Sequence, residues 1–497
     1  MLIVFLILLT TFGFYNFYWK RRKFPPGPVP LPLFGNTLEL ANDPPGYGPM
    51  IRWHQKYGPV FTVWLLETPV IVIADYTTLC ETFGGHDGDA YAGIDFMVEI
   101  LKVTKGIHGI GSTQGEEWRS LRRTTLHVLR NLGMGRPDGE RLIMDEVDNL
   151  LVSIQMSLDS GRKVFDLLSL LEFSTGSIIN KLVFGYRFTE DKKGEFNNLK
   201  KLMTELEALF SDLPCQLVME YTWLRHLPYF STHFNRIDAN LADFFALIDT
   251  QIRDTMKRKD GGEDNPDCFI DAFLRLIDQC GSVPDQYFNV ESLRGLCYDL
   301  ITAGDGTIHL TISFFALYMV IHQGVQKKVQ DELDSLIGNQ RPVTLADKPL
   351  LPYTNAVIME TQRVCNLLPF NLIHRTTRDI AINGYKFPQD TRIVPQISCV
   401  LYDEKIFPDS KEFRPERFLT ADGRLKNVEG FIPFSIGKRI CPGESLTKME
   451  LFLIAANLLN QFKLSPEDPL TLPSTSKLPG VAVAPIPFLC RVEKRYL

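Results

Sequence analysis

One stretch of the sequence combines a side chain that can bind a metal with groups that can hold a flat, charged ligand. Cys441 comes just before a predicted helix, so its sulfur would lie at the positive end of the helix dipole, which favours the thiolate. Gly437 and Gly443 would let the backbone approach a flat ligand closely, and Phe434 can pack over that ligand. Arg439, two residues before the cysteine, can pair with a carboxylate. The stretch therefore predicts a metal bound by one thiolate within a planar group that carries carboxylates.

The order of these residues, F-x-x-G-x-R-x-C-x-G, resembles the signature of the cytochrome P-450 family of haem-thiolate monooxygenases, animal microsomal type. Five fixed positions at roughly one in twenty each would recur by chance in only about one chain in ten thousand of this length. The alternative, a buried cysteine in a loop that happens to contain arginine and glycine, is correspondingly disfavoured. The resemblance implies haem b as the cofactor, with Cys441 as the ligand of the iron, Phe434 against the ring and Arg439 on a propionate. It also implies a mainly α fold with small β-sheets, the single-domain cytochrome P-450 fold, preceded by one N-terminal transmembrane helix.

Two further donors for a carboxylate lie on one predicted helix. At about 100° per residue, Trp118 and Arg122 share a face and lie some 40° apart. An indole N–H and a guanidinium both donate hydrogen bonds, so together they suit one carboxylate. They resemble the family's W-x-x-x-R, which implies that they bind a haem propionate. Arg119, Arg123 and Arg130 form a second, basic face, which predicts either a docking surface for an acidic redox partner or a solvated face without a partner.

His374 is a further candidate for binding a propionate. Relatives in the animal microsomal branch commonly carry Pro-His here, and that resemblance implies a histidine that reaches the propionate. This chain has Ile373 in place of the proline. A loop histidine with an ordinary structural role is therefore the alternative.

Glu360 and Arg363 are three residues apart on another predicted helix. Alone, such a pair would be an ordinary surface ion pair worth well under ~1 kcal/mol. With Arg417 in the later sequence P-E-R-F, the pair resembles the family's E-x-x-R and its partner motif. The resemblance implies a buried three-residue network with a structural role, from which the loss of one partner would leave a buried charge.

A long apolar segment, residues 290–322, predicts the helix that carries the oxygen chemistry. Ala303 and Gly304, followed by Thr307, align with the family's A-G-x-[D/E]-T-T. The two small residues would leave room for dioxygen and substrate beside the cofactor. Thr307 supplies a hydroxyl that can relay protons. The alternative for Thr307 is a helical threonine that bonds the carbonyl four residues earlier.

The same segment departs from the family pattern at the acid. The family's carboxylate would fall at Gly306 and its second threonine at Ile308. Asp305 stands one residue early, about 100° around a regular helix from the expected place. Three explanations are open: a local helix bulge brings Asp305 into the proton relay, water replaces the acid, or oxygen activation is impaired.

The N-terminal segment differs from the rest of the chain. Residues 1–19 carry no charge, and as a helix they would span about 28 Å, close to the ~30 Å hydrocarbon core of a bilayer. Four basic residues follow, which favours a retained anchor over a cleaved signal peptide. We expect a transmembrane anchor at 1–19, a basic stop-transfer and proline-rich hinge at 20–36 and a haem-thiolate monooxygenase domain at 37–497. The resemblance places the anchor in the endoplasmic reticulum membrane, with the catalytic domain facing the cytosol.

The remaining sequence must position these residues, and its composition suits a globular body. Hydrophobic residues make up 45% and charged residues 23%, a balance typical of a chain with a large core. The net charge of −6 argues against a nucleic-acid binder, and nine scattered cysteines argue against a disulfide framework. Most of the body has helical periodicity. Two β-prone runs within residues 57–74 predict a hairpin, and Asn383-Gly384 predicts a second, tight hairpin turn.

The resemblance implies a membrane-anchored enzyme that inserts one oxygen atom from O2 into a lipophilic small molecule such as a fatty acid, a sterol or a xenobiotic. The chain has no flavin or dinucleotide fingerprint, so electrons from NADPH would arrive through NADPH–cytochrome P-450 reductase, with cytochrome b5 as a further candidate partner. Apolar residues in the spans that line the family's pocket agree with a lipophilic substrate. They include Phe96, Phe210, Leu217, Phe370, Leu372 and Val481.

Two other functions are open. One is a reductase-independent hydroperoxide isomerase, which Gly306 makes conceivable. Thr307 and the basic face around Arg119 argue against it, because neither is needed without external electrons. The other is a haem-binding protein without turnover.

Overall fold

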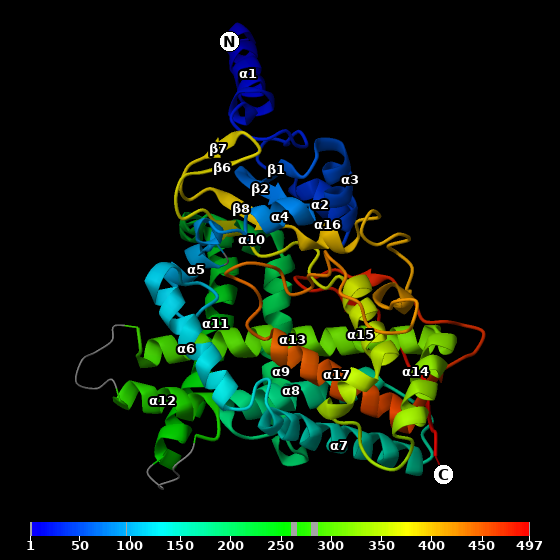
Figure 1. Ribbon diagram of the computed structural model, residues 1–497. Coiled ribbons are helices and arrows are strands. Elements are labelled where there is room, and N and C mark those ends of the chain that lie inside the picture. The colour runs from blue at the N-terminus through cyan, green and yellow to red at the C-terminus, as the bar shows by residue number, and fades with distance from the viewer. Residues whose placement is uncertain (1, 96, 260–265, 280–286, 497) are drawn as a thin grey trace. The chain divides into compact units, whose positions relative to one another are not determined.

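A computed structural model describes residues 2–95, 97–259, 266–279 and 287–496, and this part of the chain is mainly helical with four small sheets (Figure 1). The fold class predicted from the sequence is confirmed. Residue contacts divide the chain into two compact units. The sheet unit consists of Met1–Phe96, Leu368–Ser410 and Glu429–Cys441, and the helical unit of Met97–Leu367, Lys411–Val428 and Pro442–Leu497.

The sheet unit is built on a five-stranded sheet in the order β1-β2-β8-β5-β3. β1 and β2 form the predicted antiparallel hairpin, and β8 then pairs with β2 in parallel. A separate two-stranded sheet, β6-β7, turns through Asn383 and Gly384, whose φ angles of 49° and 82° are those of the predicted tight turn. The strands are β1 (Val60–Leu65), β2 (Thr68–Ile73), β3 (Gly93–Ile94), β5 (His374–Arg375), β6 (Ile380–Ile382), β7 (Tyr385–Phe387) and β8 (Arg392–Pro395). The helices are α1 (Leu2–Phe17), η1 (Trp19–Arg21), α2 (Thr37–Asn42), α3 (Tyr47–Tyr57), α4 (Tyr76–Glu81), η2 (Gly88–Tyr91) and α16 (Ile397–Leu401).

The helical unit surrounds a long central helix, α13, which packs on α8, α15 and α17 (Figure 1). Its helices are α5 (Val98–Val103), α6 (Gly115–Asn131), α7 (Pro137–Asp159), α8 (Leu167–Phe184), α9 (Lys193–Ser211), α10 (Leu213–Glu220), α11 (Pro228–Lys259), α12 (Phe269–Gln279), α13 (Val290–Ile321), α14 (Gln323–Leu336), α15 (Pro352–Cys365) and α17 (Glu444–Gln461). Its short 3₁₀ turns are η3 (Glu190–Lys192), η4 (Thr222–His226), η5 (Leu345–Leu350) and η6 (Pro415–Phe418). Its strands are β4 (Val164–Phe165), β9 (Phe462–Pro466), β10 (Lys477–Leu478), β11 (Ala484–Pro485) and β12 (Cys490–Lys494), in the sheets β4-β12-β9 and β10-β11.

α13 begins where the sequence predicts the long helix. The Asn289 side chain accepts a hydrogen bond from the Ser292 N–H at 2.8 Å and so caps the first turn. The helix is regular α-helix from Val290 to Ile321, and every side chain from 311 to 320 is buried. This burial holds α13 firmly within the helical unit, so the residues on its remaining open face are fixed in direction.

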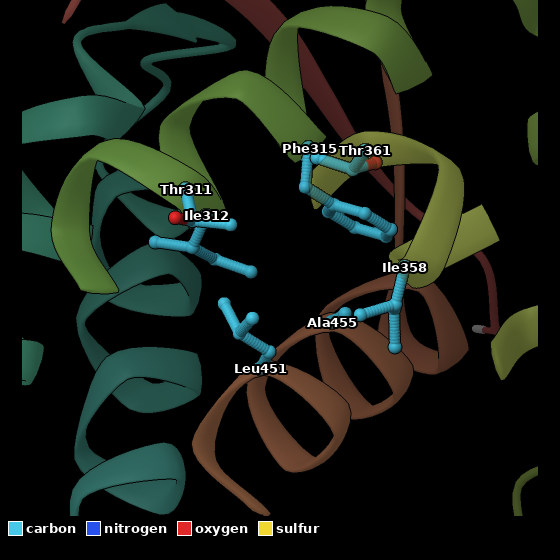
Figure 2. A pocket seen from close by; sticks show the side chains of 7 residues that line it. All are labelled: Thr311, Ile312, Phe315, Ile358, Thr361, Leu451 and Ala455. Atoms are coloured by element: carbon cyan, nitrogen blue, oxygen red, sulfur yellow. The ribbon is translucent and has the colours of Figure 1, made fainter. Parts of the chain in front are cut away.

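The junction of α13, α15 and α17 is closely packed. Figure 2 shows Ile312, Leu451 and Ile358 pointing toward one another across a narrow apolar gap, which has no room for a water molecule. None of the site residues predicted from the sequence lines this gap. The junction therefore serves as core and not as a binding site.

α1 is shorter than the predicted anchor. Its 16 residues, Leu2–Phe17, would span about 24 Å, and a 3₁₀ turn follows at Trp19–Arg21. Many of its apolar side chains are exposed, as the predicted anchor requires. Among the described residues, two helices are long and apolar enough to cross a membrane, α8 and α13, but these belong to the core and much of each is buried. The membrane role of α1 stays a prediction.

The segment after α1 is tied to the sheet unit by side chains. Asn16 donates to the carbonyl of Pro30 at 3.1 Å, and Lys20 forms an ion pair with Glu67 at 2.8 Å while lying over the Trp64 ring. The predicted hinge is therefore held at Lys20, where it begins, and at Pro30, near its middle.

Candidate functional site

The loop that leads to Cys441 belongs to the sheet unit and is closed by backbone hydrogen bonds. The Cys441 N–H donates to the Phe434 carbonyl at 3.0 Å, and the Ile440 N–H donates to the Gly437 carbonyl at 3.1 Å. Gly437 has φ of +89°, and a Cβ there would lie 2.1 Å from the Phe83 carbonyl oxygen. Gly437 is thus required by the packing of the loop on Phe83, a role that differs from the close approach to a ligand expected from the sequence. The result is a loop held by its own hydrogen bonds and by packing on Phe83, which ends in a half-buried Cys441.

Arg439 and His374 come together on two consecutive carbonyl groups. Arg439 Nε donates to the Ala92 oxygen at 2.8 Å, and His374 Nδ1 lies 2.8 Å from the Tyr91 oxygen. Burial, with a smaller contribution from the charge of Arg439, lowers the pKa of His374 to about 4, although the hydrogen bond to Tyr91 opposes this shift. The neutral ring therefore carries its proton on Nδ1, and its Nε2 is an acceptor. His374 can donate to a carboxylate only if it takes up a second proton, which a nearby carboxylate would favour.

The strand that carries His374 is held by a buried ion cluster that the sequence did not reveal. Asp95 is 5% exposed at its side chain and contacts Arg392 Nε at 2.5 Å and Arg375 Nε at 2.5 Å. The pairing of β3, β5 and β8 brings these three residues together, with Ile94 opposite His374. Because the contact joins residues some 280 positions apart, no local spacing could have pointed to it. Asp95 positions the His374 strand.

Trp118 and Arg122 share one face of α6, in the helical unit, as predicted. Trp118 is buried, and the Arg122 guanidinium lies 5.8 Å from the centre of its ring. The other predicted face, formed by Arg119, Arg123 and Arg130, is exposed to solvent. Arg119 also forms an ion pair with Glu116, which reduces the positive charge of that face.

α13 presents Ala303 and Thr307 on its open face. Ala303 is exposed and Thr307 is half-buried, although the next turns of the helix are fully buried. Thr307 Oγ1 donates to the Ala303 carbonyl at 2.8 Å, the bond that the alternative interpretation of this residue predicts. Thr302 and Thr311 make the same bond to the carbonyl four residues earlier, so it does not distinguish Thr307 from other helical threonines.

Gly304 serves helix packing and not the open face. A Cβ at this position would lie 2.8 Å from Ile179 Cδ1 of α8, so glycine lets the two helices approach closely. Of the small pair predicted from the sequence, only Ala303 borders open space. A Cβ at Gly306 would meet no atom within 4 Å. The position at which the family carries its acid is therefore open space.

Asp305 lies on a different face of α13 from Thr307. Its Oδ1 would be 3.0 Å from a Cβ at Gly176 of α8, and α13 has no bulge at this point. On a regular helix the two residues lie about 200° apart around the axis. The helix bulge, one of the three explanations for the displaced acid, is thus not observed.

Asp305 is a buried acid with an unusual titration. Burial raises its pKa to about 7, with smaller effects of the charges of Glu172, Lys200 and Glu207. Glu450 of α17 is also buried, and its pKa is raised by burial and by the charge of Asp305. The Oδ1 of Asp305 and both carboxylate oxygens of Glu450 have no hydrogen-bond partner among the described residues. Burial therefore disfavours the ionised form of both acids, and Asp305 titrates near neutral pH.

We predict that Asp305→Asn changes the pH dependence of stability. The ordinary pKa of 3.8 applies to the unfolded chain and the value of about 7 to the folded chain, so the wild type loses stability as the pH rises between these values. The loss is at most about 4 kcal/mol. Asparagine does not ionise, so Tm of the variant minus Tm of the wild type should increase by several degrees from pH 5 to pH 8. Asp191→Asn, at a fully exposed acid, is the control and should show no such trend. A Tm difference that is constant with pH for Asp305→Asn would contradict the raised pKa.

The predicted network of Glu360, Arg363 and Arg417 is present in the helical unit. Arg363 Nε lies 2.7 Å from Glu360 Oε2, and Arg417 Nε lies 2.9 Å from Glu360 Oε1. Glu360 and Arg363 are completely buried. The same carboxylate also accepts the Arg414 N–H at 2.9 Å. The network therefore joins α15 to the segment that contains η6.

The described apolar residues predicted to line a substrate pocket are half-buried or exposed, and Phe370 packs against the core of the sheet unit. Phe210, Leu217 and Phe370 are half-buried, and Leu372 and Val481 are exposed. Phe96 lies outside the described residues. Partial exposure of single apolar side chains is common and does not by itself mark a binding surface.

The chain was compared with known proteins. Residues 25–492 match the family model described as Cytochrome P450. The chain is 32% identical to Cytochrome P450 2G1 of Oryctolagus cuniculus, over 96% of this chain and 95% of that protein. It is 35% identical to Cytochrome P450 2S1 of Homo sapiens, over 95% of this chain and 92% of that protein. It is 36% identical to Cytochrome P450 2H2 of Gallus gallus, over 90% of this chain and 88% of that protein. With this match along nearly its whole length, the chain belongs to the cytochrome P450 family of haem monooxygenases.

Proposed function

We propose that the protein inserts one oxygen atom from O2 into a lipophilic small molecule, with electrons that come from NADPH through NADPH–cytochrome P450 reductase. The observation that carries this proposal is the loop at Cys441, which the packing of Gly437 on Phe83 holds rigid and which leaves the cysteine half-buried. A cysteine placed in this way suits a metal ligand better than a core side chain, because it is neither sealed in the core nor freely mobile.

The donor set fits haem b. Cys441 offers one soft, anionic ligand, as a haem-thiolate iron requires. Arg439, Trp118 and Arg122 are proposed to donate hydrogen bonds to the haem propionates, and His374 is proposed to join them once its ring takes up a second proton. Phe434 is proposed to pack against the ring. When bound, the haem supplies the iron that activates dioxygen, while the protein supplies position and protons.

We assign proton control to α13. Ala303 leaves space on the open face, and Thr307 holds a proton on Oγ1 that is shared with the Ala303 carbonyl. Rotation about its χ1 bond can redirect that proton away from the helix. The open space at Gly306 accommodates water beside Thr307, in the position where the family carries an acid. We therefore propose that water replaces the acid, the second of the three explanations.

Thr307→Val should lower the amount of product formed per NADPH consumed by about tenfold or more, because the isosteric side chain has no proton to hold or pass on. Thr307→Ser retains the hydroxyl and should recover most of the yield. Thr311→Val, which removes a buried hydroxyl with the same helical bond one turn later, is the matched control. Product and NADPH are measured together in a reconstituted system. If Thr307→Val and Thr311→Val give equal yields, Thr307 has no special part in the reaction.

Asp305→Asn should leave the product formed per NADPH unchanged, because Asp305 lies on the face of α13 that packs on α8. The yield should be compared at pH 7, alongside Thr307→Val. A clear fall in yield for Asp305→Asn would show that Asp305 takes part in the reaction. It would also require α13 to change its conformation during the reaction.

We further propose that α1 anchors the protein in the endoplasmic reticulum membrane, with the rest of the chain in the cytosol. The reductase is proposed to dock on the exposed basic face of α6, formed by Arg119, Arg123 and Arg130, and cytochrome b5 is a second candidate for the same face. The run of basic residues that follows α1 supports the proposed anchor and its orientation.

The decisive experiment reconstitutes the purified protein with the reductase and NADPH in lipid vesicles and supplies a lipid extract under ¹⁸O₂. We expect products heavier by one ¹⁸O atom, formed only when NADPH and reductase are both present. Conversion of lipid hydroperoxides without NADPH, and without ¹⁸O incorporation, would show an isomerase in place of the proposed monooxygenase. No conversion in either assay would leave a haem-binding protein without turnover.

A further inference from the structure

A cysteine, a histidine and an aspartate converge at the junction of α9 and α10 with α11. Cys215 Sγ lies 2.9 Å from Asp212 Oδ2 and 3.7 Å from His233 Nδ1, and His233 Nδ1 lies 3.1 Å from Asp212 Oδ2. Among the described residues, these three side chains form a group that could hold a metal ion, because their ligand atoms all lie within 4.8 Å of one another. None of the three is among the residues proposed to bind haem.

The geometry of the three ligand atoms suits a tetrahedral divalent metal. Zinc binds thiolate sulfur at about 2.3 Å and nitrogen or oxygen at about 2.0–2.2 Å, which places tetrahedral ligand atoms roughly 3.3–3.6 Å apart. The two distances to His233 Nδ1, 3.1 and 3.7 Å, are close to that range. Cys215 Sγ lies 2.9 Å from Asp212 Oδ2, which is short for a thiol hydrogen bond, and this distance would lengthen by about half an ångström or more when a metal replaces the proton.

The electrostatics also suit a cation. A thiolate, a carboxylate and a neutral imidazole together carry the two negative charges that balance a divalent ion. Cys215 is completely buried, and its side chain donates to Asp212 in the absence of metal. Its pKa is raised to about 12 by burial and by Asp212, so metal binding must displace the thiol proton into solvent. Arg236 lies 3.4 Å from Asp212 Oδ2 and opposes a cation, but its side chain is 52% exposed and can move into solvent.

We propose that Asp212, Cys215 and His233 bind one borderline-soft divalent metal ion, zinc in the first place, with a fourth position for water. Cysteine and histidine together select zinc over magnesium or calcium. On binding, the Sγ–H bond breaks, an Sγ–metal bond forms, and one proton leaves to solvent. The ion connects the start of α10 to α11. Its ligands from these two helices, Cys215 and His233, are 18 residues apart in the sequence.

Bound metal should also order part of the predicted substrate pocket. Gln216 Nε2, one residue after Cys215, donates to the Phe210 carbonyl at 2.6 Å. Phe210 and Leu217 are two of the half-buried apolar residues proposed to line the pocket. This consequence rests on the proposed function, whereas metal binding itself does not.

The test is equilibrium dialysis of the haem-loaded protein against buffered zinc, with zinc and iron measured by plasma mass spectrometry. We expect one zinc per chain that is lost in Cys215→Ser and in His233→Gln, with affinity lowered by more than about tenfold for each. Cys268→Ser, at a buried cysteine outside the group, and His127→Gln, at an exposed histidine, are matched controls and should bind as the wild type does. Arg236→Gln should bind zinc more tightly, because it removes the opposing charge.

Two further measurements separate a lost ligand from a damaged fold. Zinc should raise Tm of the wild type and of the control variants but not of Cys215→Ser or His233→Gln. The second measurement is haem content, which Cys215→Ser and His233→Gln should retain at the level of the wild type. Equal zinc content in the wild type, Cys215→Ser and His233→Gln, with each variant retaining its haem, would overturn the proposal. Because haem content and zinc content are measured separately, failure of this site is distinguished from failure of the haem site.

Discussion

Replacing Arg363 by alanine should give a protein that loses most of its haem and much of its stability. Arg363 donates through Nε to Glu360 Oε2 at 2.7 Å and through Nη2 to Glu360 Oε1 at 2.8 Å, and both residues are completely buried. Alanine leaves the Glu360 carboxylate in the core with Arg417 as its remaining cation. Breaking a buried pair in this way costs about 3–5 kcal/mol, a large share of the ~5–15 kcal/mol that stabilises a typical protein.

The loss of stability should reach the haem because of what the network holds. Glu360 also accepts the Arg414 N–H, and Arg363 Nη2 donates to the Glu412 carbonyl at 3.2 Å. These bonds fix the segment 411–418 against α15. The chain continues from this segment toward the Cys441 loop, so a loosened segment should permit the loop to sample other positions. We therefore expect a preparation with little haem per chain and not a fully loaded enzyme with altered kinetics.

The measurement is the ratio of haem to protein after purification, together with Tm. Arg363→Lys retains the charge but loses the second hydrogen bond, and it should fall between the wild type and Arg363→Ala. Arg424→Ala, which removes an exposed arginine paired with Asp422 at 2.6 Å, is the matched control and should change Tm by little. Full haem content and an unchanged Tm in Arg363→Ala would show that the network is not needed.

Cys441→Ser should abolish monooxygenase activity and change the spectrum of the bound haem. Serine has nearly the same size as cysteine, but its hydroxyl is a hard, neutral ligand with a far higher pKa than a thiol. The ferrous carbon monoxide complex of the wild type should show the far-red Soret maximum that a thiolate ligand gives. The variant should show a maximum like that of a globin, or it should bind no haem, and oxygen insertion should fall below detection.

Cys80→Ser is the matched control for this prediction. Cys80 is the other half-buried cysteine of the sheet unit, and it should tolerate serine with an unchanged spectrum. A wild-type spectrum without the far-red maximum would refute thiolate ligation altogether. A spectral shift caused by Cys80→Ser and not by Cys441→Ser would identify Cys80 as the iron ligand. That result would contradict the family pattern.

The sequence predicted well those features that depend on local spacing. The shared face of Trp118 and Arg122 follows from the helical repeat, and the turn at Asn383-Gly384 follows from the backbone freedom of those two residues. The network of Glu360, Arg363 and Arg417 was predicted because its motifs resemble those of a known family.

Features that depend on long-range contacts could not be predicted in this way. A helical repeat gives the angle between two side chains but not the neighbour that each one meets, so the packing of Gly304 and Asp305 on α8 was invisible in the sequence. The approach of Gly437 to Phe83 joins positions more than 350 residues apart. The group at Asp212, Cys215 and His233 has no motif spacing, because its third member comes from a separate helix.

The contacts around α1 have a consequence for how the protein meets a bilayer. The hydrogen bond from Asn16 to Pro30 and the ion pair of Lys20 with Glu67 restrict rotation of α1 against β1 and its neighbours. If α1 is the proposed anchor, a change in its tilt within the bilayer should therefore also rotate β1 and its neighbours. Lys20 is paired with Glu67, so Arg21, Arg22 and Lys23 are the cations of this run that an anchored α1 would bring near lipid phosphates.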